Sequence, residues 1–331
     1  MISTSDFIKL PFTPDLTESG IAYATRTLAH GMDYSGSQFL RLRRIVSTVA
    51  VELAFRRSLG ERKVPFDIKR TQPFSDSDRY DVTLGGHRCN IQTNLTSRRN
   101  LITLIRNNPG ELLQAPALIP EDQLSSVNPN TKDLYLFAFL LGITTNSVED
   151  IRKALNANQK IYPLHPLRTA WAHPQIWAPL QKLSLKSESD TTIIVEIGGL
   201  DANRNFITEK LTLSPSKRSF AENTYYSLAY IHTHNMPETR LGLHTPDKGE
   251  PYLILPHEWD NIWIYGLEIW LTGYMDQDEF RRKASTNLTG SRIFQYSQTQ
   301  LKSLSIPVKE LHALDNLFKQ VKNWELNRKT W

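Results

Sequence analysis

The sequence predicts an α/β domain, in which helices flank a mixed sheet, followed by a β-rich, sandwich-like domain with C-terminal helices. Three observations predict this order. Residues 35–160 show a helical pattern, three short β-like segments, a helix, a buried strand and a further helix. From residue 192 the pattern changes to short β-like runs with Gly, Pro and Asn between them, at a spacing of about ten residues. Helical patterns return at residues 278–284 and 308–321.

Length and composition favour more than one domain. The chain has 331 residues, above the roughly 100–200 residues of a typical domain. We expect an irregular segment at 1–34, an α/β domain at 35–165 and a β-rich domain with C-terminal helices at 166–331. The single cysteine, Cys89, excludes an internal disulfide framework and fits a reducing cytoplasm. No apolar run reaches the ~18–20 residues of a membrane span, so we expect a cytoplasmic protein with no membrane partner.

Each element of the α/β domain has a local signal. The first helix should begin after Ser35 or Ser37 as N-cap, with Gly60 just past its end. Strands are expected at 64–68, 79–84 and 87–93, and a helix from about Ser97 to Arg106. The continuous apolar run at 134–143 is typical of a strand buried on both faces. A capping-box pattern at Ser147 predicts another helix, through residue 155.

Positive charge is concentrated in the first third of the chain. Residues 1–110 contain 13 Arg and 3 Lys against 10 Asp and Glu, a net charge of +6, while the whole chain carries +5. The excess is mostly arginine, whose planar guanidinium suits phosphate and guanine. This pattern predicts contact with DNA, with Arg44, Arg88, Arg98 and Arg99 as candidate contacts. The alternative is a basic surface that only keeps the protein soluble.

A hairpin at residues 79–93 carries the candidate site. Two glycines, Gly85 and Gly86, separate two runs, which is a strong hairpin signal. With these glycines as the turn, Leu84 pairs with His87, Thr83 with Arg88, Val82 with Cys89, and Asp81 with Asn90. Because side chains alternate along a strand, one face is then polar and the other is apolar and core-facing. The polar face comprises Asp81, Thr83, Arg88, Asn90 and Gln92. The alternative is that this face is merely solvent-exposed.

Together with the preceding helix, these residues resemble the PD-(D/E)XK superfamily, which includes many type II restriction enzymes, archaeal resolvases and repair nucleases. The resemblance rests on Val49-Ala-Val-Glu-Leu-Ala-Phe and on Tyr80-Asp-Val-Thr-Leu-Gly-Gly-His-Arg-Cys-Asn-Ile-Gln-Thr. It covers about residues 35–160 and implies a restriction-endonuclease-like core. The family motif is an acid on one strand, then acid-x-Lys on the next, often with a Glu on the preceding helix. Asp81 matches the first acid and Glu52 the helical Glu.

The second half of the motif departs from the family pattern. Asn90 stands where an acid is expected, and Gln92 where Lys is expected. The resemblance implies a Mg²⁺ site with Asp81, Glu52 and Asn90 as ligands, and Gln92 as the residue that orients the attacking water. A neutral amide binds Mg²⁺ less strongly than a carboxylate does, so weak or lost catalysis is expected. For Glu52, an ion pair with Arg56 is the structural alternative to a role in the site.

Three functions follow from these patterns. The first is a Mg²⁺-dependent DNA endonuclease of a prokaryotic restriction or defence system, with Asp81, Asn90, Gln92 and Glu52 as catalytic residues. The second is a non-catalytic nucleic-acid-binding or assembly subunit on the same fold. The third is a β-sandwich recognition protein with a structural N-terminal domain. In the first two, the C-terminal β-rich domain would select the target, form a homodimer or bind a partner of a defence complex.

Overall fold

A computed structural model describes residues 1–30, 37–68, 82–121, 124, 133–145, 147–299 and 301–328. The chain forms two compact units. Unit 1 comprises Met1–Gly20, Ser47–Ile143 and Ile264–Trp331, and unit 2 comprises Ile21–Val46 and Thr144–Trp263. This division differs from the expected one at 34 and 165, because the C-terminal segment belongs to unit 1.

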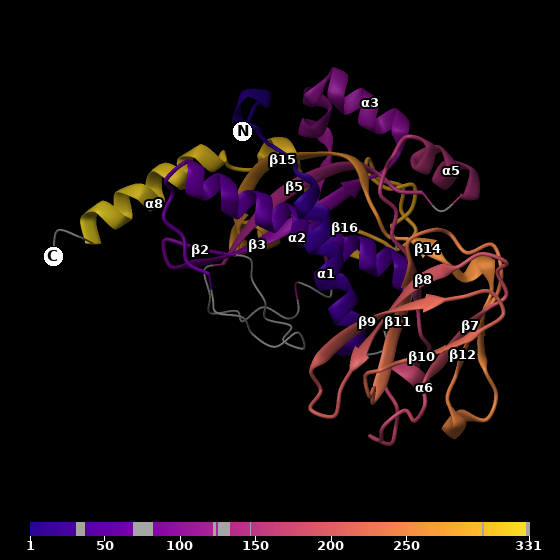
Figure 1. The fold of residues 1–331 in the computed structure, drawn as a ribbon. Helices are drawn as coiled ribbons and strands as arrows, with labels where there is room; N and C mark the ends of the chain where they lie inside the picture. Colours follow the sequence, from indigo (N-terminus) through magenta and orange to yellow (C-terminus); the bar gives the residue numbers. More distant parts are fainter. Residues whose placement is uncertain are drawn as a thin grey trace. The chain divides into compact units, whose positions relative to one another are not determined.

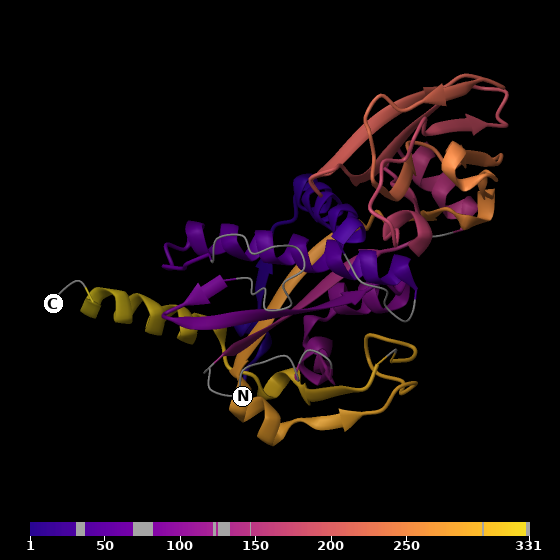
Figure 2. The same ribbon diagram turned by 90° about the horizontal axis from the view of Figure 1, so that it is seen from below.

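Unit 1 is built on a mixed sheet (Figures 1 and 2). In spatial order, its strands are β1 (Ile8–Leu10), β15 (Tyr265–Asp276), β5 (Leu134–Ile143), β3 (His87–Thr96) and β2 (Val82–Leu84). Strands β3 and β5 are parallel, whereas the other neighbours are antiparallel. Beyond β2, Asp67 bridges Thr83 in an antiparallel arrangement. The expected mixed sheet with flanking helices is thus confirmed.

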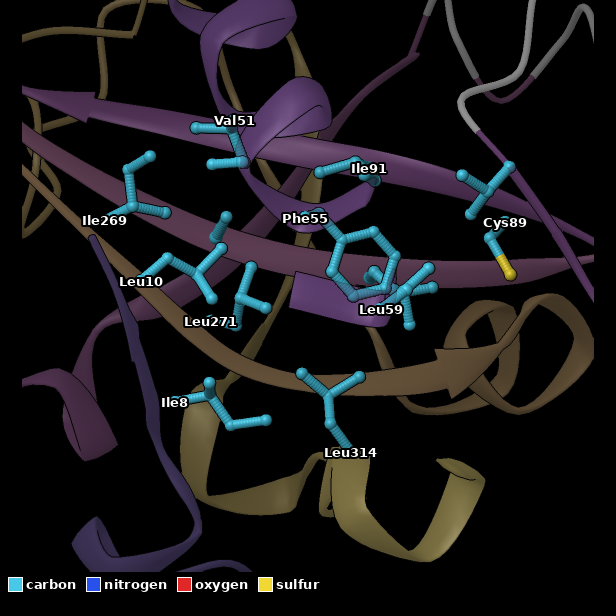
Figure 3. Packing of buried hydrophobic residues seen from close by; sticks show 14 of the residues in the cluster. Ile8, Leu10, Val51, Phe55, Leu59, Cys89, Ile91, Ile269, Leu271 and Leu314 are labelled. Carbon is cyan, nitrogen blue, oxygen red and sulfur yellow. The ribbon is translucent and has the colours of Figure 1, made fainter. Parts of the chain in front are cut away.

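Two helices cover one face of this sheet. Helix α2 (Gln38–Glu61) contributes Val51, Phe55 and Leu59 to a buried cluster, and α8 (Leu314–Arg328) contributes Leu314. Figure 3 shows these side chains among those of β1, β3 and β15. Phe55 is fully buried and lies 6.3 Å from Phe318 of α8, centroid to centroid. This apolar packing fixes α2 against the sheet.

The opposite face carries a second core. Its cover consists of α3 (Arg99–Asn107), α7 (Gln277–Lys283) and a small sheet of β16 (Ser285–Asn287), β17 (Ser303–Pro307) and β4 (Pro116–Pro120). Strand β5 alternates between the two cores: Leu134 and Leu136 point to the α2 side, and Tyr135 and Phe137 to the α3 side. The expectation of a strand buried on both faces is confirmed.

Several segments differ from the sequence expectation. The strand expected at 64–68 is reduced to the Asp67 bridge, and β4 forms where no strand was expected. Two further differences involve the ends of the chain. Residues 1–34 were expected to be irregular, yet α1 spans Pro14–His30. Proline is compatible with the first turn of a helix, because its missing N–H has no partner there. The second segment is 264–331. Strand β15 pairs with β5 from Tyr265 opposite Ile143 to Asp276 opposite Leu134, which draws this part of the chain into unit 1.

Unit 2 has two antiparallel sheets. One contains β10 (Arg218–Phe220), β7 (Ser184–Ser187), β12 (Leu241–His244) and β13 (Tyr252–Ile254). The other contains β14 (Asp260–Asn261), β6 (Pro163–Pro166), β11 (Ser227–Thr233), β8 (Ile193–Leu200) and β9 (Phe206–Leu213). One buried cluster takes side chains from both sheets, including Leu185, Leu243, Ile197 and Ile231. This two-sheet arrangement agrees with the expected β-rich region.

Polar groups also hold unit 2 together. Arg43 of α2 is 5% exposed and pairs with Asp260, with 2.6 Å between its Nη2 and the Asp260 Oδ1. Its Nε also donates to the carbonyl of Asn261 at 3.2 Å. Unit 2 also contains α5 (Val148–Asn156), α6 (Thr169–Ala172) and the part of α1 from Ile21 onwards. None of the helices described here combines the length and apolar content that crossing a lipid bilayer requires.

Candidate nucleic-acid interface

The hairpin forms in the expected register. Val82 pairs with Cys89, Thr83 with Arg88, and Leu84 with His87. Both turn residues have left-handed backbones, with φ of 57° at Gly85 and 85° at Gly86. Two consecutive residues of positive φ are what a tight two-residue hairpin requires, and glycine adopts them without a steric penalty.

Alternation along β3 separates its side chains into two faces. Cys89 and Ile91 lie in the buried cluster on the α2 side. Asn90, Gln92 and Asn94 point to the other side, because they stand in register with Tyr135, Phe137 and Phe139 of the second core. We call these three side chains the amide face. The predicted segregation of polar and apolar side chains is therefore found, but the polar side is covered.

Side-chain hydrogen bonds link the residues of the amide face to one another and to Gln295, although the Nδ2 of Asn94 and the Oε1 of Gln295 are buried without a hydrogen-bond partner among the described residues. Gln92 is 5% exposed, and its Nε2 donates to the Oδ1 of Asn90 at 2.5 Å. Asn94 is also buried, and its Oδ1 accepts from the Nε2 of Gln295 at 3.3 Å. The same Nε2 donates to the carbonyl of Pro116 at 2.8 Å. The side chains of the two motif residues therefore bind each other, with Gln92 buried and Asn90 partly exposed.

A carboxylate and a phenol border the amide face. Asp133, which precedes β5, is buried and lies 3.8 Å from the Nε of Arg88. Arg88, a candidate phosphate contact, is thus close to an internal anion. Beside Asn90 in the register is Tyr135, and burial raises the pKa of its hydroxyl to about 12. A hydroxyl with so high a pKa remains protonated at neutral pH.

Glu52 does not join the amide face. It lies on α2, whose apolar side chains pack against the opposite face of the sheet. Its carboxylate forms an i,i+4 ion pair with Arg56. The sheet therefore separates the Glu52 helix from Asn90 and Gln92, and the predicted grouping of these three residues is corrected. Packing of α2 through Val51 and Phe55 is the physical reason.

The predicted Mg²⁺ ligands are Asp81, Glu52 and Asn90. Asp81 lies outside the described residues. Among those that are described, no group of three or more His, Cys, Asp or Glu side chains is placed to hold a metal ion. At the motif itself the oxygen of Asn90 already accepts from Gln92, and hard divalent cations favour carboxylates. The motif residues seen here therefore do not fit a Mg²⁺ site.

No family model, curated protein or solved structure matches this chain.

Two arginines stand at the start of α3. Arg98 is the N-cap residue, Arg99 is the first residue of the helix, and both are exposed. The first turn contains no acid, although an acid there would be stabilised by the helix dipole. Two cations at the positive end of a helix are unfavourable by themselves, and a bound anion offsets that cost. Arg106, further along, is engaged by Glu268 at 2.6 Å.

A loop of residues 288–299, which we call the strap, lies against this helix. Arg98 donates to the carbonyl of Phe294, and Gln295 reaches the amide face. Backbone hydrogen bonds close the strap, from Gly290 N to Thr299 O at 2.8 Å and from Thr299 N to Ser291 O at 2.9 Å. The strap carries Arg292, which is exposed, and no acid. Arg98, Arg99 and Arg292 are thus exposed on two segments that touch through Arg98 and Phe294, and we call these three residues the arginine surface.

Sequence reasoning identified Arg98 and Arg99 but missed Asp133, Arg292 and Gln295. These residues reach the site from parts of the chain far from the motif, and no local pattern marks them. Arg44, the remaining candidate contact, is exposed on the part of α2 that belongs to unit 2.

Proposed function

We propose that this protein binds DNA through a nuclease-like core that no longer hydrolyses phosphodiesters. The observation that carries the proposal is the hydrogen bond between Gln92 and Asn90. In the family that the motif resembles, an acid stands at the position of Asn90 and a lysine at the position of Gln92. A neutral amide pair supplies neither the charge that binds a metal nor the cation that balances a developing negative charge.

The order of elements supports the nuclease-like core. Helix α2, the antiparallel row of Asp67, β2 and β3, helix α3 and then β5 parallel to β3 follow one another in the chain. Apart from β4, which precedes β5, this is the order that the sequence predicts for the part of the chain that the resemblance covers. Glu52, which is paired with Arg56 on the other side of the sheet, supports the loss of hydrolysis.

The arginine surface supports the binding part of the proposal. Three arginines without a neighbouring acid in the same segments, two of them at the positive end of a helix, suit a phosphate backbone. Other exposed residues of α3 and the strap carry amide or hydroxyl groups, which donate hydrogen bonds without repelling an anion: Asn100, Thr103, Thr289, Ser297 and Gln298. Such contacts position a duplex without reading its sequence. We therefore expect binding with little sequence preference.

The test is the salt dependence of binding to a labelled blunt DNA duplex, followed by fluorescence anisotropy. Each phosphate contact contributes about 0.9 to the slope of log K against log salt. Replacing Arg98, Arg99 and Arg292 together by Gln is therefore expected to reduce the slope by roughly 2–3. At low salt it should weaken binding about 10- to 100-fold.

A matched variant removes the same charge elsewhere. Lys182, Arg204 and Arg218 are exposed in unit 2, and their replacement by Gln should leave the slope near its native value. Equal losses in the two triple variants would mean that only net charge matters. That outcome, or a native protein that does not bind the duplex, would refute the proposed surface.

A further inference from the structure

A groove of about 630 Å³ opens in unit 1, between the start of β3 and α8. His87 and Leu134 line it, and both stand on the α2 side of the sheet, because His87 pairs with Leu84 of the first core. The groove therefore faces away from the amide face. Its volume is within the ~300–1,000 Å³ usual for small-molecule sites.

Trp324 of α8 forms one wall of this groove and is held by the hairpin turn. A Cβ atom on Gly85 would lie 2.2 Å from the Trp324 ring, so only glycine allows this approach. The imidazole of His87 lies 5.7 Å from the same ring, centroid to centroid. Trp324 nevertheless remains 41% exposed. A large aromatic ring that is positioned yet accessible is a stacking surface.

The neighbouring groups on α8 have complementary chemistry. Asn316, Gln320 and Trp324 are spaced four residues apart, which places them along one face of the helix. Lys319 also lines the groove. Neither amide side chain is hydrogen-bonded to a described residue, and Lys319 has no carboxylate within ion-pair distance among them. One cation and two amides are thus available beside the ring.

The remaining charged groups of the groove are already engaged. His312 Nε2 lies 2.7 Å from Glu279 Oε2, and the Oδ1 of Asp276 accepts from the Glu279 backbone N–H at 2.7 Å. Asp276 thereby caps α7. Lys319 is left as the charge that meets a ligand.

We propose that this groove binds a nucleotide, either free or as the unpaired end of a nucleic-acid strand. The base stacks on Trp324, the amides of Gln320 and Asn316 hydrogen-bond its edge, and Lys319 holds the phosphate. Aromatic stacking with amide and cation contacts is the chemistry by which proteins hold unpaired nucleotides. The site lies apart from the arginine surface and does not depend on it.

The experiment uses the full chain and three probes. These are the four nucleoside monophosphates by titration calorimetry, a labelled ten-residue oligothymidylate by anisotropy, and the blunt duplex as a comparison. Trp324→Ala is expected to weaken binding of the nucleotide or single strand about 10-fold or more, whereas Trp324→Phe retains most of it. Lys319→Gln should lower the salt dependence of nucleotide or single-strand binding. Tight binding of a monophosphate indicates a free nucleotide as ligand, and binding of the oligonucleotide alone indicates a strand end.

Two further variants make the result decisive. Gly85→Ala displaces the ring while keeping Trp324, so it should reproduce the loss seen with Trp324→Ala. Trp177→Ala, in unit 2, removes an indole elsewhere and should bind as the native chain does. Circular dichroism checks that each variant is folded. Failure of all single-stranded and mononucleotide probes to bind, or unchanged binding by folded Trp324→Ala, overturns the proposal. The variant with Arg98, Arg99 and Arg292 replaced by Gln should still bind the nucleotide. The proposals for the arginine surface and for the groove can therefore be refuted independently.

Discussion

Replacing Arg43 by Ala is expected to lower the free energy of unfolding by about 3–5 kcal/mol. The guanidinium is buried between Asp260 and the Asn261 carbonyl, and its removal deprives a largely buried carboxylate of its ion-pair partner. Burial raises the pKa of Asp260 even with Arg43 beside it, which shows how costly that charge already is. Urea unfolding followed by tryptophan fluorescence measures the change.

Two companion variants test the cause. Arg44 is the next residue on α2 and is exposed, so Arg44→Ala should change stability by less than about 0.5 kcal/mol. Adding Asp260→Asn to Arg43→Ala removes the buried charge and should recover part of the loss. If the double variant is no more stable than Arg43→Ala alone, lost packing rather than the lost ion pair is responsible.

Acid is expected to destabilise unit 2 through His232. This side chain is 3% exposed, and burial lowers its pKa to about 4 although its Nδ1 donates to the Pro163 carbonyl at 2.8 Å. In the unfolded chain the pKa is the ordinary 6.5. The stabilisation from a neutral His232 is therefore complete above pH 6.5 and is lost as the pH falls towards 4. The loss amounts to about 3 kcal/mol.

Unfolding at pH 7 and pH 4.5 measures this effect. His232→Asn places an amide N–H near the Nδ1 position but does not titrate. The free energy of unfolding of this variant should therefore fall between pH 7 and pH 4.5 by about 2–3 kcal/mol less than that of the native chain. His257→Asn changes an exposed histidine and should keep the native dependence. Burial also lowers the pKa of His165, so some acid sensitivity should remain in the His232 variant. An unchanged pH dependence in His232→Asn would contradict this explanation.

Local signals predicted α2, β3, α3 and β5, but not β4. The Gly85-Gly86 pair defined the register of the hairpin, and the run at 134–143 matched β5 residue for residue. The hairpin register depends on residues that are neighbours in the chain, and β5 depends on a continuous run of buried residues. Both features can be recognised in the sequence. Helix α1 was missed because Pro11, Pro14 and Gly20 were read as punctuation of an irregular segment.

Long-range pairing could not be predicted in the same way. Strand β15 joins β5 across more than a hundred residues, and the strap brings Gln295 onto Asn94 across 201 residues. Alternation on β3 correctly grouped Asn90 with Gln92, but nothing in the hairpin indicates that a later segment covers them. For Glu52, the motif predicted a role in the site, whereas the face of the sheet against which its helix packs is a tertiary property that no local pattern contains.

The most direct test of the central proposal is a plasmid assay with Mg²⁺ and with Mn²⁺, run under conditions in which anisotropy shows that the DNA is bound. Binding without nicking is expected from the native chain and from Asp81→Ala alike, because Asn90 and Gln92 form a neutral pair. Nicking by the native chain that disappears in Asp81→Ala would contradict the proposal and establish an active metal-dependent nuclease.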